Sequence, residues 1–314
     1  MDTPLVSAVI PTYNRANVVG EAIQSTLQQT YENIEVLVVD DHSTDNTKEV
    51  VESFDDSRVR YLLNQRTKGA QGARNTGIDE ANGEWVAFLD SDDRWMPEKL
   101  SKQLKYIEES DEEVHALATG FVRERNGQVW RRKQNENCSW NAEAFLRSTP
   151  VGNFSVLIAR RNVLVQVGGL DEGLPAMQDM DLFYRVSKNY NFCSMVECLV
   201  VISTDANNRI SSKYEDKLHA SIAFFEKHYE DITKRDLYIY RGAYIAFFAL
   251  LARRWDVFRK YVRFFGLGLY HCPLDILFLC GSMALKNGGV RRVYRSFRQW
   301  KSEYNTNVET GMSV

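Results

Sequence analysis

The stretch VAFLDSDDRW, residues 86–95, places an apolar run directly before three carboxylates. Its first residues have the composition of a buried strand, and Asp90, Asp92 and Asp93 follow at once. Clustered carboxylates repel one another and are unfavourable to bury without partners. They therefore indicate a solvated loop or a hard cation with oxygen ligands. An Asp that caps a helix starting near Pro97 is the alternative, and these residues alone leave both interpretations open.

Strand-like and helix-like segments alternate on the N-terminal side of this stretch. Strands are expected at 5–10, 34–39, 59–63 and 85–89, and helices at 16–29, 47–54 and 70–81. This alternation predicts an α/β fold with a mostly parallel sheet flanked by helices. Ligands of such sheets bind beyond the carboxyl ends of the strands. Three polar clusters should therefore meet at one edge: Pro11-Thr12-Tyr13, Asp40-Asp41 and Asp90-Ser91-Asp92.

A loop rich in glycine and cations, residues 68–75, opens the expected helix at 70–81. Backbone amides at a helix N-terminus suit anions, and Lys68 and Arg74 would add positive charge for a phosphate. A flexible turn is the alternative. The loop is not a Walker A sequence, and no GxGxxG follows the first strand, which disfavours P-loop and dinucleotide sites.

Length and composition describe a globular protein. The 314 residues, 44% hydrophobic and 26% charged, fit one large domain with an appendage or two domains. A net charge of −3 gives no reason to expect nucleic-acid binding, and the five cysteines lack paired metal spacing and fit a reducing compartment. The sequence has no signal-peptide pattern and no apolar run of about 18 residues. We therefore expect a cytoplasmic chain without a transmembrane helix.

Four ordered motifs resemble the inverting, nucleotide-sugar-dependent glycosyltransferases of family 2. They are AVIPTYNR at 8–15, VVDDHSTDNT at 38–47, GARNTGIDEANGEWVAFLDSDD at 72–93 and QDMDLFYR at 178–185. Their order and separations also match, over roughly residues 4 to 212. The resemblance implies the GT-A fold, in which a nucleotide-binding parallel sheet is merged with an acceptor-binding portion.

The resemblance also implies which residues bind the nucleotide sugar. Asp41 with Asp40 would hold the base, and Tyr13 would stack on it unless it is merely a surface aromatic. Asp90 would bind ribose or sugar hydroxyls, and Asp92 would coordinate Mn²⁺ or Mg²⁺ bridging the diphosphate. The full set of expected donor-binding residues is Pro11, Thr12, Tyr13, Arg15, Asp40, Asp41, Lys68, Arg74, Asn75, Asp90, Ser91 and Arg209.

An inverting transfer also needs a base that takes the proton of the acceptor hydroxyl. The run Gln178-Asp179-Met180-Asp181 resembles the acidic motif of the family, usually Glu-Asp, and makes Asp179 the candidate base. Gln178 stands where Glu is commoner, and Asp181 would support the helix or contact the acceptor. Helix capping by either Asp is the alternative. The turn at 168–172 also fits the family, and 153–158 is expected to be a strand.

The C-terminal third is expected to be helical. The predicted division is a GT-A domain at 1–212 (halves 1–95 and 96–212), a helical region at 213–304, with a buried helix at 238–251, and a disordered tail at 305–314. Within 253–301, Lys and Arg greatly outnumber the acidic residues, and aromatic residues are interleaved. This pattern suits a segment lying on an anionic membrane surface, and a small helical bundle is the alternative.

The sequence thus predicts an inverting, metal-dependent glycosyltransferase. It would move a sugar from a nucleotide sugar, expected to be UDP-linked, to a glycan or lipid-linked acceptor in cell-surface polysaccharide assembly. It would be cytoplasmic or peripheral on the inner face of the cell membrane. Two alternatives are a non-catalytic nucleotide-sugar-binding subunit and a nucleotidyltransferase. The Asp-x-Asp pattern and Asp179 argue against the first of these.

Overall fold

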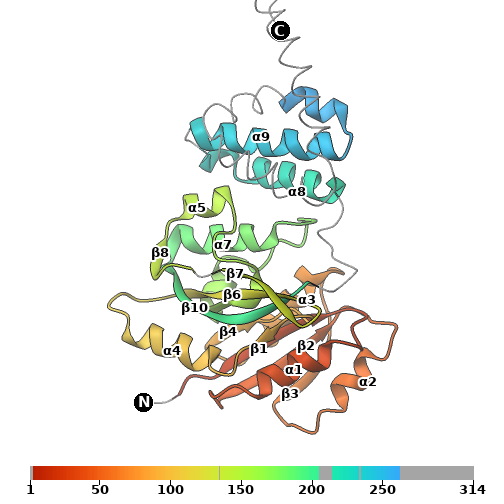
Figure 1. Cartoon of the computed structure of the whole chain (residues 1–314), viewed down its shortest axis with the longest axis vertical. Helices are drawn as coiled ribbons and strands as arrows, with labels where there is room; N and C mark the ends of the chain where they lie inside the picture. The colour runs from red at the N-terminus through yellow and green to blue at the C-terminus, as the bar shows by residue number, and fades with distance from the viewer. Residues whose placement is uncertain (1–2, 134, 205–213, 233–234, 262–314) are drawn as a thin grey trace, which may run out of the picture. The chain divides into compact units, whose positions relative to one another are not determined.

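The computed structural model describes residues 3–133, 135–204, 214–232 and 235–261 (Figure 1). The chain divides into two compact units, Met1–Lys227 and His228–Val314. Three of the sequence expectations lie wholly or mostly outside the described residues, namely Arg209, the tail at 305–314 and most of the segment 253–301.

The described part of the first unit is built on a ten-stranded mixed sheet. Eight of the strands follow the order β3-β2-β1-β4-β9-β6-β10-β5, and the other two pair outside this order, β7 with β6 and β8 with β10. The strands β1, β2, β3 and β4 are mutually parallel, and β9 runs antiparallel to both β4 and β6. The strand bounds are β1 (Val6–Thr12), β2 (Ile34–Asp40), β3 (Val59–Leu63), β4 (Trp85–Phe88), β5 (Arg94–Trp95), β6 (Ala116–Arg125), β7 (Gln128–Lys133), β8 (Cys138–Trp140), β9 (Leu157–Arg160) and β10 (Phe192–Ser203).

Helices flank this sheet (Figure 1). Those of the first unit are α1 (Val19–Leu27), α2 (Thr47–Glu52), α3 (Ala70–Glu80), α4 (Lys99–Glu109), α5 (Ala142–Arg147), the 3₁₀ helix η1 (Phe154–Val156), α6 (Arg161–Gln166), α7 (Gln178–Asn189) and α8 (Tyr214–Lys227). Every residue of β1 is buried, as expected for a strand that is covered on both faces. These elements confirm the α/β class expected from the sequence.

Helix α3 packs unusually close to β1. A Cβ atom added at Gly77 would lie 2.3 Å from Cγ1 of Val9, so no larger residue fits at this position without movement of the strand or the helix. Gly77 therefore allows the helix that carries Arg74 to approach the end of β1.

The carboxyl ends of three parallel strands meet at one edge, as the sequence predicted. Thr12 at the end of β1 is opposite Asp40 at the end of β2, and Val9 is opposite Phe88 of β4. The backbone N–H of Asp41 donates to the carbonyl of Thr12 at 2.8 Å, which continues the pairing of β1 and β2 past the last residue of β2. Residues from distant motifs are thus brought to a shared edge.

The expected strand at 153–158 is partly wrong. Residues Phe154–Val156 form η1, and β9 begins only at Leu157. Ser155 is fully buried in η1. Its hydroxyl accepts from the backbone N–H of Asp90 at 3.0 Å and donates to the carboxylate of Asp93 at 2.6 Å. These bonds to the end of β4 take the place of strand pairing.

The described part of the second unit is helical. It contains the 3₁₀ helix η3 (Tyr229–Asp231) and α9 (Arg235–Leu251). Most residues of α9 from Arg241 onward are buried, which confirms the buried helix expected at 238–251. Within the described residues, no helix is both long enough and apolar enough to cross a membrane.

Candidate active site

Asp41 anchors the glycine-rich loop to the end of β2. Its carboxylate accepts from the backbone N–H of Gly69 at 2.8 Å and from the side-chain amide of Asn64 at 2.7 Å. Asp41 is 5% exposed, so both bonds compensate the loss of its hydration. The carboxylate therefore positions the loop that opens α3.

Asp40 is a buried support of the turn that follows β2. One carboxylate oxygen accepts from the backbone N–H and the hydroxyl of Ser43, at 2.9 and 2.6 Å. The other accepts from the hydroxyl of Tyr61 at 2.7 Å, and burial together with this carboxylate raises the pKa of Tyr61. Both oxygens of Asp40 thus bind protein donors, and its expected contact with a nucleotide base stays a prediction.

Lys68 and Tyr13 form the exposed rim of this edge. Tyr13 is 44% exposed, and the Lys68 ammonium lies 4.8 Å from the centroid of its ring. Pro11 and Thr12 beneath them are buried, and the Thr12 hydroxyl has no hydrogen-bond partner within the described part of the chain. The backbone N–H of Arg15 donates to the hydroxyl of Thr47 at 2.9 Å. A cation and an aromatic ring from separate motifs therefore meet here, an arrangement that suits a base and a phosphate.

Arg74 and Asp90 form the central ion pair of the site. Arg74 is 7% exposed, its guanidinium lies 4.4 Å from the centroid of the Phe154 ring, and it also donates to the carbonyl of Ala70 at 3.3 Å. The second carboxylate oxygen of Asp90 accepts from the side-chain amide of Asn153 at 3.2 Å. Because a buried charge needs a partner, Arg74 and Asp90 hold each other at the end of β4.

Asp93 joins β4 to β10 and does not cap a helix. Its carboxylate accepts from the hydroxyl of Ser155 at 2.6 Å, the side chain of Asn153 at 3.1 Å and the backbone N–H of Ser203 at 3.1 Å. Burial, with Asp90 and Asp92 nearby, raises the pKa of Asp93 well above its usual range. The capping interpretation is wrong for this residue, because its oxygens bind donors from distant segments.

Asp179 lies in the first turn of α7 and close to the Arg74–Asp90 pair. Burial raises the pKa of Asp179 to about 6. The backbone N–H of Met180, at 2.8 Å, and the charge of Arg74 oppose this rise, while Asp90 adds to it. Asp179 is nevertheless partly exposed. The structure therefore brings a carboxylate with the pKa of a general base to the edge where β1, β2 and β4 end.

Asp181 has a structural setting that differs from that of Asp179. It is fully buried, and its carboxylate pairs with Arg185 at 2.7 Å and with Lys227 at 2.8 Å. Arg185 also donates to the carbonyls of Val167 and Gly169, at 2.5 and 2.7 Å. Asp181 thus supports α7 and joins it to the preceding turn and to α8.

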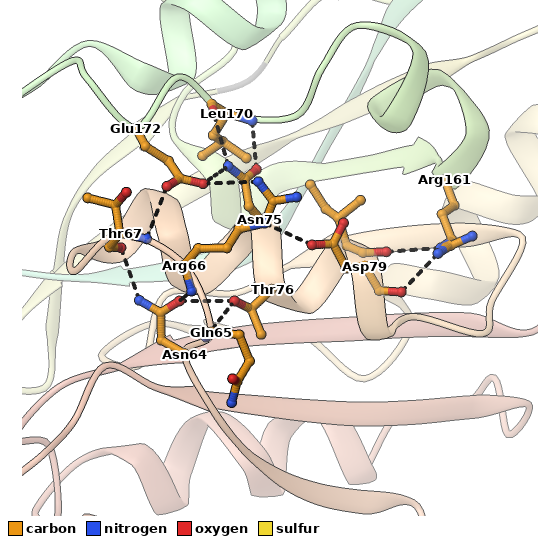
Figure 2. A network of polar contacts seen from close by, with 11 residues as sticks. Asn64, Gln65, Arg66, Thr67, Asn75, Thr76, Asp79, Arg161, Leu170 and Glu172 are labelled. Atoms are coloured by element: carbon orange, nitrogen blue, oxygen red, sulfur yellow. Dashed lines mark hydrogen bonds and ion pairs between the residues drawn. The ribbon is translucent and has the colours of Figure 1, made fainter.

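Asn75 faces the turn at 168–172, where it meets Leu170 and Glu172 (Figure 2). Its amide nitrogen donates to the carbonyl of Leu170 at 2.9 Å and to the carboxylate of Glu172 at 2.7 Å. Its amide oxygen accepts from the backbone N–H of Leu170 at 2.8 Å. These bonds use its amide nitrogen and oxygen within the fold, and its expected donor contact stays a prediction.

The sequence reasoning missed Asn153, Ser155 and Glu172, which connect the site residues to one another. A usable signal was present for two of them, because Asn153 and Ser155 are polar residues within an otherwise apolar, strand-like run. Ser91 is buried beside them, and Asp92 is partly exposed.

A metal ion can be accommodated only with help from a substrate. Among the described residues, no group of three or more His, Cys, Asp or Glu side chains could hold one. Asp90 and Asp93 bind protein donors, and Asp92 supplies one partly exposed carboxylate. One carboxylate fits a hard cation such as Mg²⁺ or Mn²⁺ that takes its other ligands from water and phosphate oxygens.

Sequence relatives were found in bacterial glycan synthesis. The model of the family described as "Glycosyl transferase family 2" matches residues 7–160. The putative teichuronic acid biosynthesis glycosyltransferase TuaG of Bacillus subtilis is 31% identical over 214 residues, which are 67% of this chain and 82% of TuaG. The UDP-Glc:alpha-D-GlcNAc-diphosphoundecaprenol beta-1,3-glucosyltransferase WfgD of Escherichia coli is 50% identical over 107 residues. That match covers 34% of this chain and 42% of WfgD, less than half of either protein.

Two solved structures share the fold along most of the chain. Staphylococcus aureus TarS 1-349, in complex with UDP-GlcNAc, has a TM-score of 0.59 at 19% identity. The match covers 94% of this chain and 92% of the TarS chain. The mannosyltransferase PcManGT of Pyrobaculum calidifontis, in complex with GDP-Man and Mn2+, has a TM-score of 0.56 at 20% identity. The match covers 96% of this chain and 84% of PcManGT. At this identity the likeness concerns the fold alone, and it confirms the expected GT-A class.

Proposed function

The chain belongs to glycosyl transferase family 2, and from this premise we propose that it is an inverting glycosyltransferase that uses a nucleotide sugar. One observation carries the proposal: the carboxylate of Asp179 interacts electrostatically with both members of the Arg74–Asp90 pair, at the edge where the parallel strands end. A base, a donor-binding cation and a carboxylate for hydroxyl groups are thereby available at a single edge.

Asp179 would act as the base of a single displacement. With a pKa of about 6, it is mostly ionised at neutral pH and still basic enough to accept a proton. The acceptor oxygen attacks the anomeric carbon as its proton passes to the carboxylate of Asp179. The bond between the anomeric carbon and the diphosphate oxygen breaks, and its electron pair leaves with the nucleotide diphosphate.

Positively charged residues would hold the leaving diphosphate. Arg74 is kept in place by Asp90 and Phe154, and Lys68 lies over Tyr13 at the rim. A Mg²⁺ or Mn²⁺ ion bound with the donor would be held by Asp92, and its charge would stabilise the departing diphosphate. Asp90, bonded to both Arg74 and Asn153, is fixed for contact with ribose or sugar hydroxyls.

We propose a UDP-sugar as the donor and a lipid-linked saccharide as the acceptor. The names of WfgD and of the GalNAc(5)-diNAcBac-PP-undecaprenol beta-1,3-glucosyltransferase of Campylobacter jejuni support a diphosphate-linked lipid acceptor. The UDP-GlcNAc complex of TarS shares the fold and supports a UDP-sugar. The reaction would belong to cell-surface polysaccharide assembly, with the chain peripheral on the inner face of the membrane and residues 253–301 in contact with it.

Release of nucleotide diphosphate tests this function. The chain is incubated with UDP-, GDP- and dTDP-sugars, with Mn²⁺ or with EDTA, and with or without a membrane lipid extract. We expect release from one UDP-sugar, dependent on metal and increased by the extract. Donor binding by calorimetry without any release would instead identify a binding subunit. Pyrophosphate release from a nucleoside triphosphate and a sugar phosphate would identify a nucleotidyltransferase.

A further inference from the structure

A basic hairpin extends from the first unit. It consists of β6 and β7, joined by the two-residue turn Asn126-Gly127. Asn126 has φ 48° and Gly127 has φ 72°, the left-handed pair of a tight hairpin turn. The hairpin contains five cations, and its one acidic residue is Glu124; the cations are Arg123, Arg125, Arg131, Arg132 and Lys133.

Four of these cations share one face of the hairpin. Arg123 is opposite Arg131, Lys133 is opposite Phe121, and Arg125 is opposite Gln128. Residues that pair across strands, and those two apart along a strand, lie on the same face. Glu124 lies on the other face, where its carboxylate pairs with Arg94 at 2.8 Å. This face of the hairpin therefore carries cations without a carboxylate from the hairpin itself.

The cations of this face lie close enough to act on one another, and Arg123 is directly opposite Arg131. Burial, together with the charges of Arg131 and Arg123, lowers the pKa of Lys133 to about 8. The chain as a whole has a net charge of −3, so the positive charge is concentrated locally. A surface with this local concentration of positive charge suits an anionic partner.

A bulge adds an exposed aromatic residue to the hairpin. The register shifts so that Arg123 pairs with Arg131 and Glu124 with Val129, which leaves Trp130 as the extra residue. The Trp130 side chain is 54% exposed and Val129 is 49% exposed. The indole N–H donates to the hydroxyl of Thr204 at 3.3 Å. An exposed ring with a satisfied polar group, next to Arg residues, suits the boundary between water and lipid.

We propose that the hairpin β6–β7 docks the first unit onto an anionic membrane surface. Trp130 enters the headgroup region, and Arg125 and Arg131 of the four-cation face contact lipid phosphates. This surface lies on the first unit and is distinct from the segment 253–301. Its proposed docking does not depend on the proposed glycosyl transfer.

The base of the hairpin lies close to the candidate active site. A Cβ atom at Gly152 would lie 2.8 Å from the Phe121 ring, and the next residue, Asn153, donates to Asp90 at 3.2 Å. Lys133 and Arg123 lie over the same Phe121 ring, at 5.9 and 5.6 Å from its centroid. A docked hairpin therefore holds the site near the lipid surface, where a lipid-borne acceptor is found.

Vesicle binding of the full chain tests the cations. Partitioning is measured by sedimentation with phosphatidylcholine vesicles, with and without phosphatidylglycerol. The double variant R125Q/R131Q removes two cations of the docking face and should bind anionic vesicles at least about tenfold more weakly, because each cation near such a surface contributes substantially. The matched control K102Q/K105Q removes two exposed cations from α4 and should bind like the original chain. Equal binding by all three proteins, or equal binding to neutral vesicles, would overturn the proposal.

Quenching by brominated lipids tests the insertion of Trp130. The chain has six tryptophans, so the difference in quenching between the original chain and W130F reports Trp130. We expect less quenching in W130F on anionic vesicles. Identical quenching would show that the ring stays outside the lipid. If R125Q/R131Q instead loses binding of inorganic pyrophosphate and keeps vesicle binding, the surface recognises a free diphosphate and the membrane assignment fails.

Discussion

The side chains of Asn75 and Glu172 are hydrogen-bonded at 2.7 Å, which joins α3 to the turn that precedes α7 (Figure 2). Glu172 also accepts from the backbone N–H of Thr67 at 3.1 Å and pairs with Arg66 at 3.3 Å. Burial alone would raise the pKa of Glu172, but the hydrogen bonds from Asn75 and Thr67 hold this pKa below its usual value. The Glu172 carboxylate therefore links α3, which carries Arg74, to the turn that leads into α7, which carries Asp179.

Removal of the Glu172 carboxylate should destabilise the first unit. Glu172→Ala leaves one N–H of the Asn75 amide and the backbone N–H of Thr67 without their acceptor, so we expect the free energy of unfolding to fall by about 1–3 kcal/mol. Urea denaturation measures it. Glu80→Ala is the control, because the pair of Glu80 with Arg60 is largely exposed and should contribute less than about 1 kcal/mol. Equal losses in the two variants would contradict the bridging role of Glu172.

The pH dependence of transfer should report Asp179. The carboxylate must be ionised to accept a proton, and its pKa is about 6. We therefore expect kcat/KM to fall about tenfold per pH unit below that value and to be level above it. Rates of nucleotide diphosphate release between pH 4.5 and 8 measure this. A rate that stays constant down to pH 4.5 would be incompatible with Asp179 as the base.

Asp179→Asn should abolish transfer and stabilise the fold. The folded-state pKa of Asp179 lies above the unfolded value of 3.8, so the fold favours the protonated carboxyl. The stability that this protonation contributes is complete below pH 3.8 and is lost as pH rises through about 6. At pH 8 the ionised group is unfavourable, and removing its charge should add about 1–2 kcal/mol after allowance for its partial exposure. Denaturation at pH 8 measures the stability, nucleotide diphosphate release measures transfer, and donor calorimetry checks that donor binding is kept. Lower stability, or lost donor binding in a folded variant, would refute this assignment.

Gly77→Ala should disturb the contact between α3 and β1. The added Cβ would lie 2.3 Å from Val9, and relief of this overlap should reduce the free energy of unfolding by about 1–3 kcal/mol. Gly20→Ala is the matched control, because its Cβ would meet no atom closer than 3.8 Å. Ala is also the better helix former, so the control should be neutral or slightly more stable. Thermal denaturation compares the two, and an unaffected G77A variant would count against this packing.

EDTA should affect activity and leave stability unchanged. Asp92 is a single carboxylate, and a cation would be completed by the donor diphosphate. We expect EDTA to stop nucleotide diphosphate release while the Tm of the chain without donor is unaltered. A fall in Tm on addition of EDTA would reveal a resident structural metal and contradict this interpretation.

The parallel half of the sheet and its polar edge could be predicted from the sequence. Local patterns were sufficient, because buried parallel strands require continuous apolar runs such as those at 34–39 and 85–89. The topology of parallel units then places Thr12, Asp41 and Asp90 at one edge without knowledge of side-chain contacts. Resemblance to the acidic motif of the family made Asp179 the candidate base, and in the structure it interacts electrostatically with Arg74 and Asp90.

Only the tertiary structure decided what each polar side chain binds. Asp40, Asn75 and Asp93 appear within the motifs as equivalent site candidates or caps, yet their oxygens or amides bind donors and acceptors elsewhere in the fold. Tyr61, Leu170 and Ser155, their respective partners, lie 21, 95 and 62 residues away along the chain. A buried polar group must be paired, but which partner pairs with it depends on the segments that packing brings near. Sequence therefore determined the edge of the sheet and the chemistry gathered there, and long-range packing determined which of those groups hold the site together.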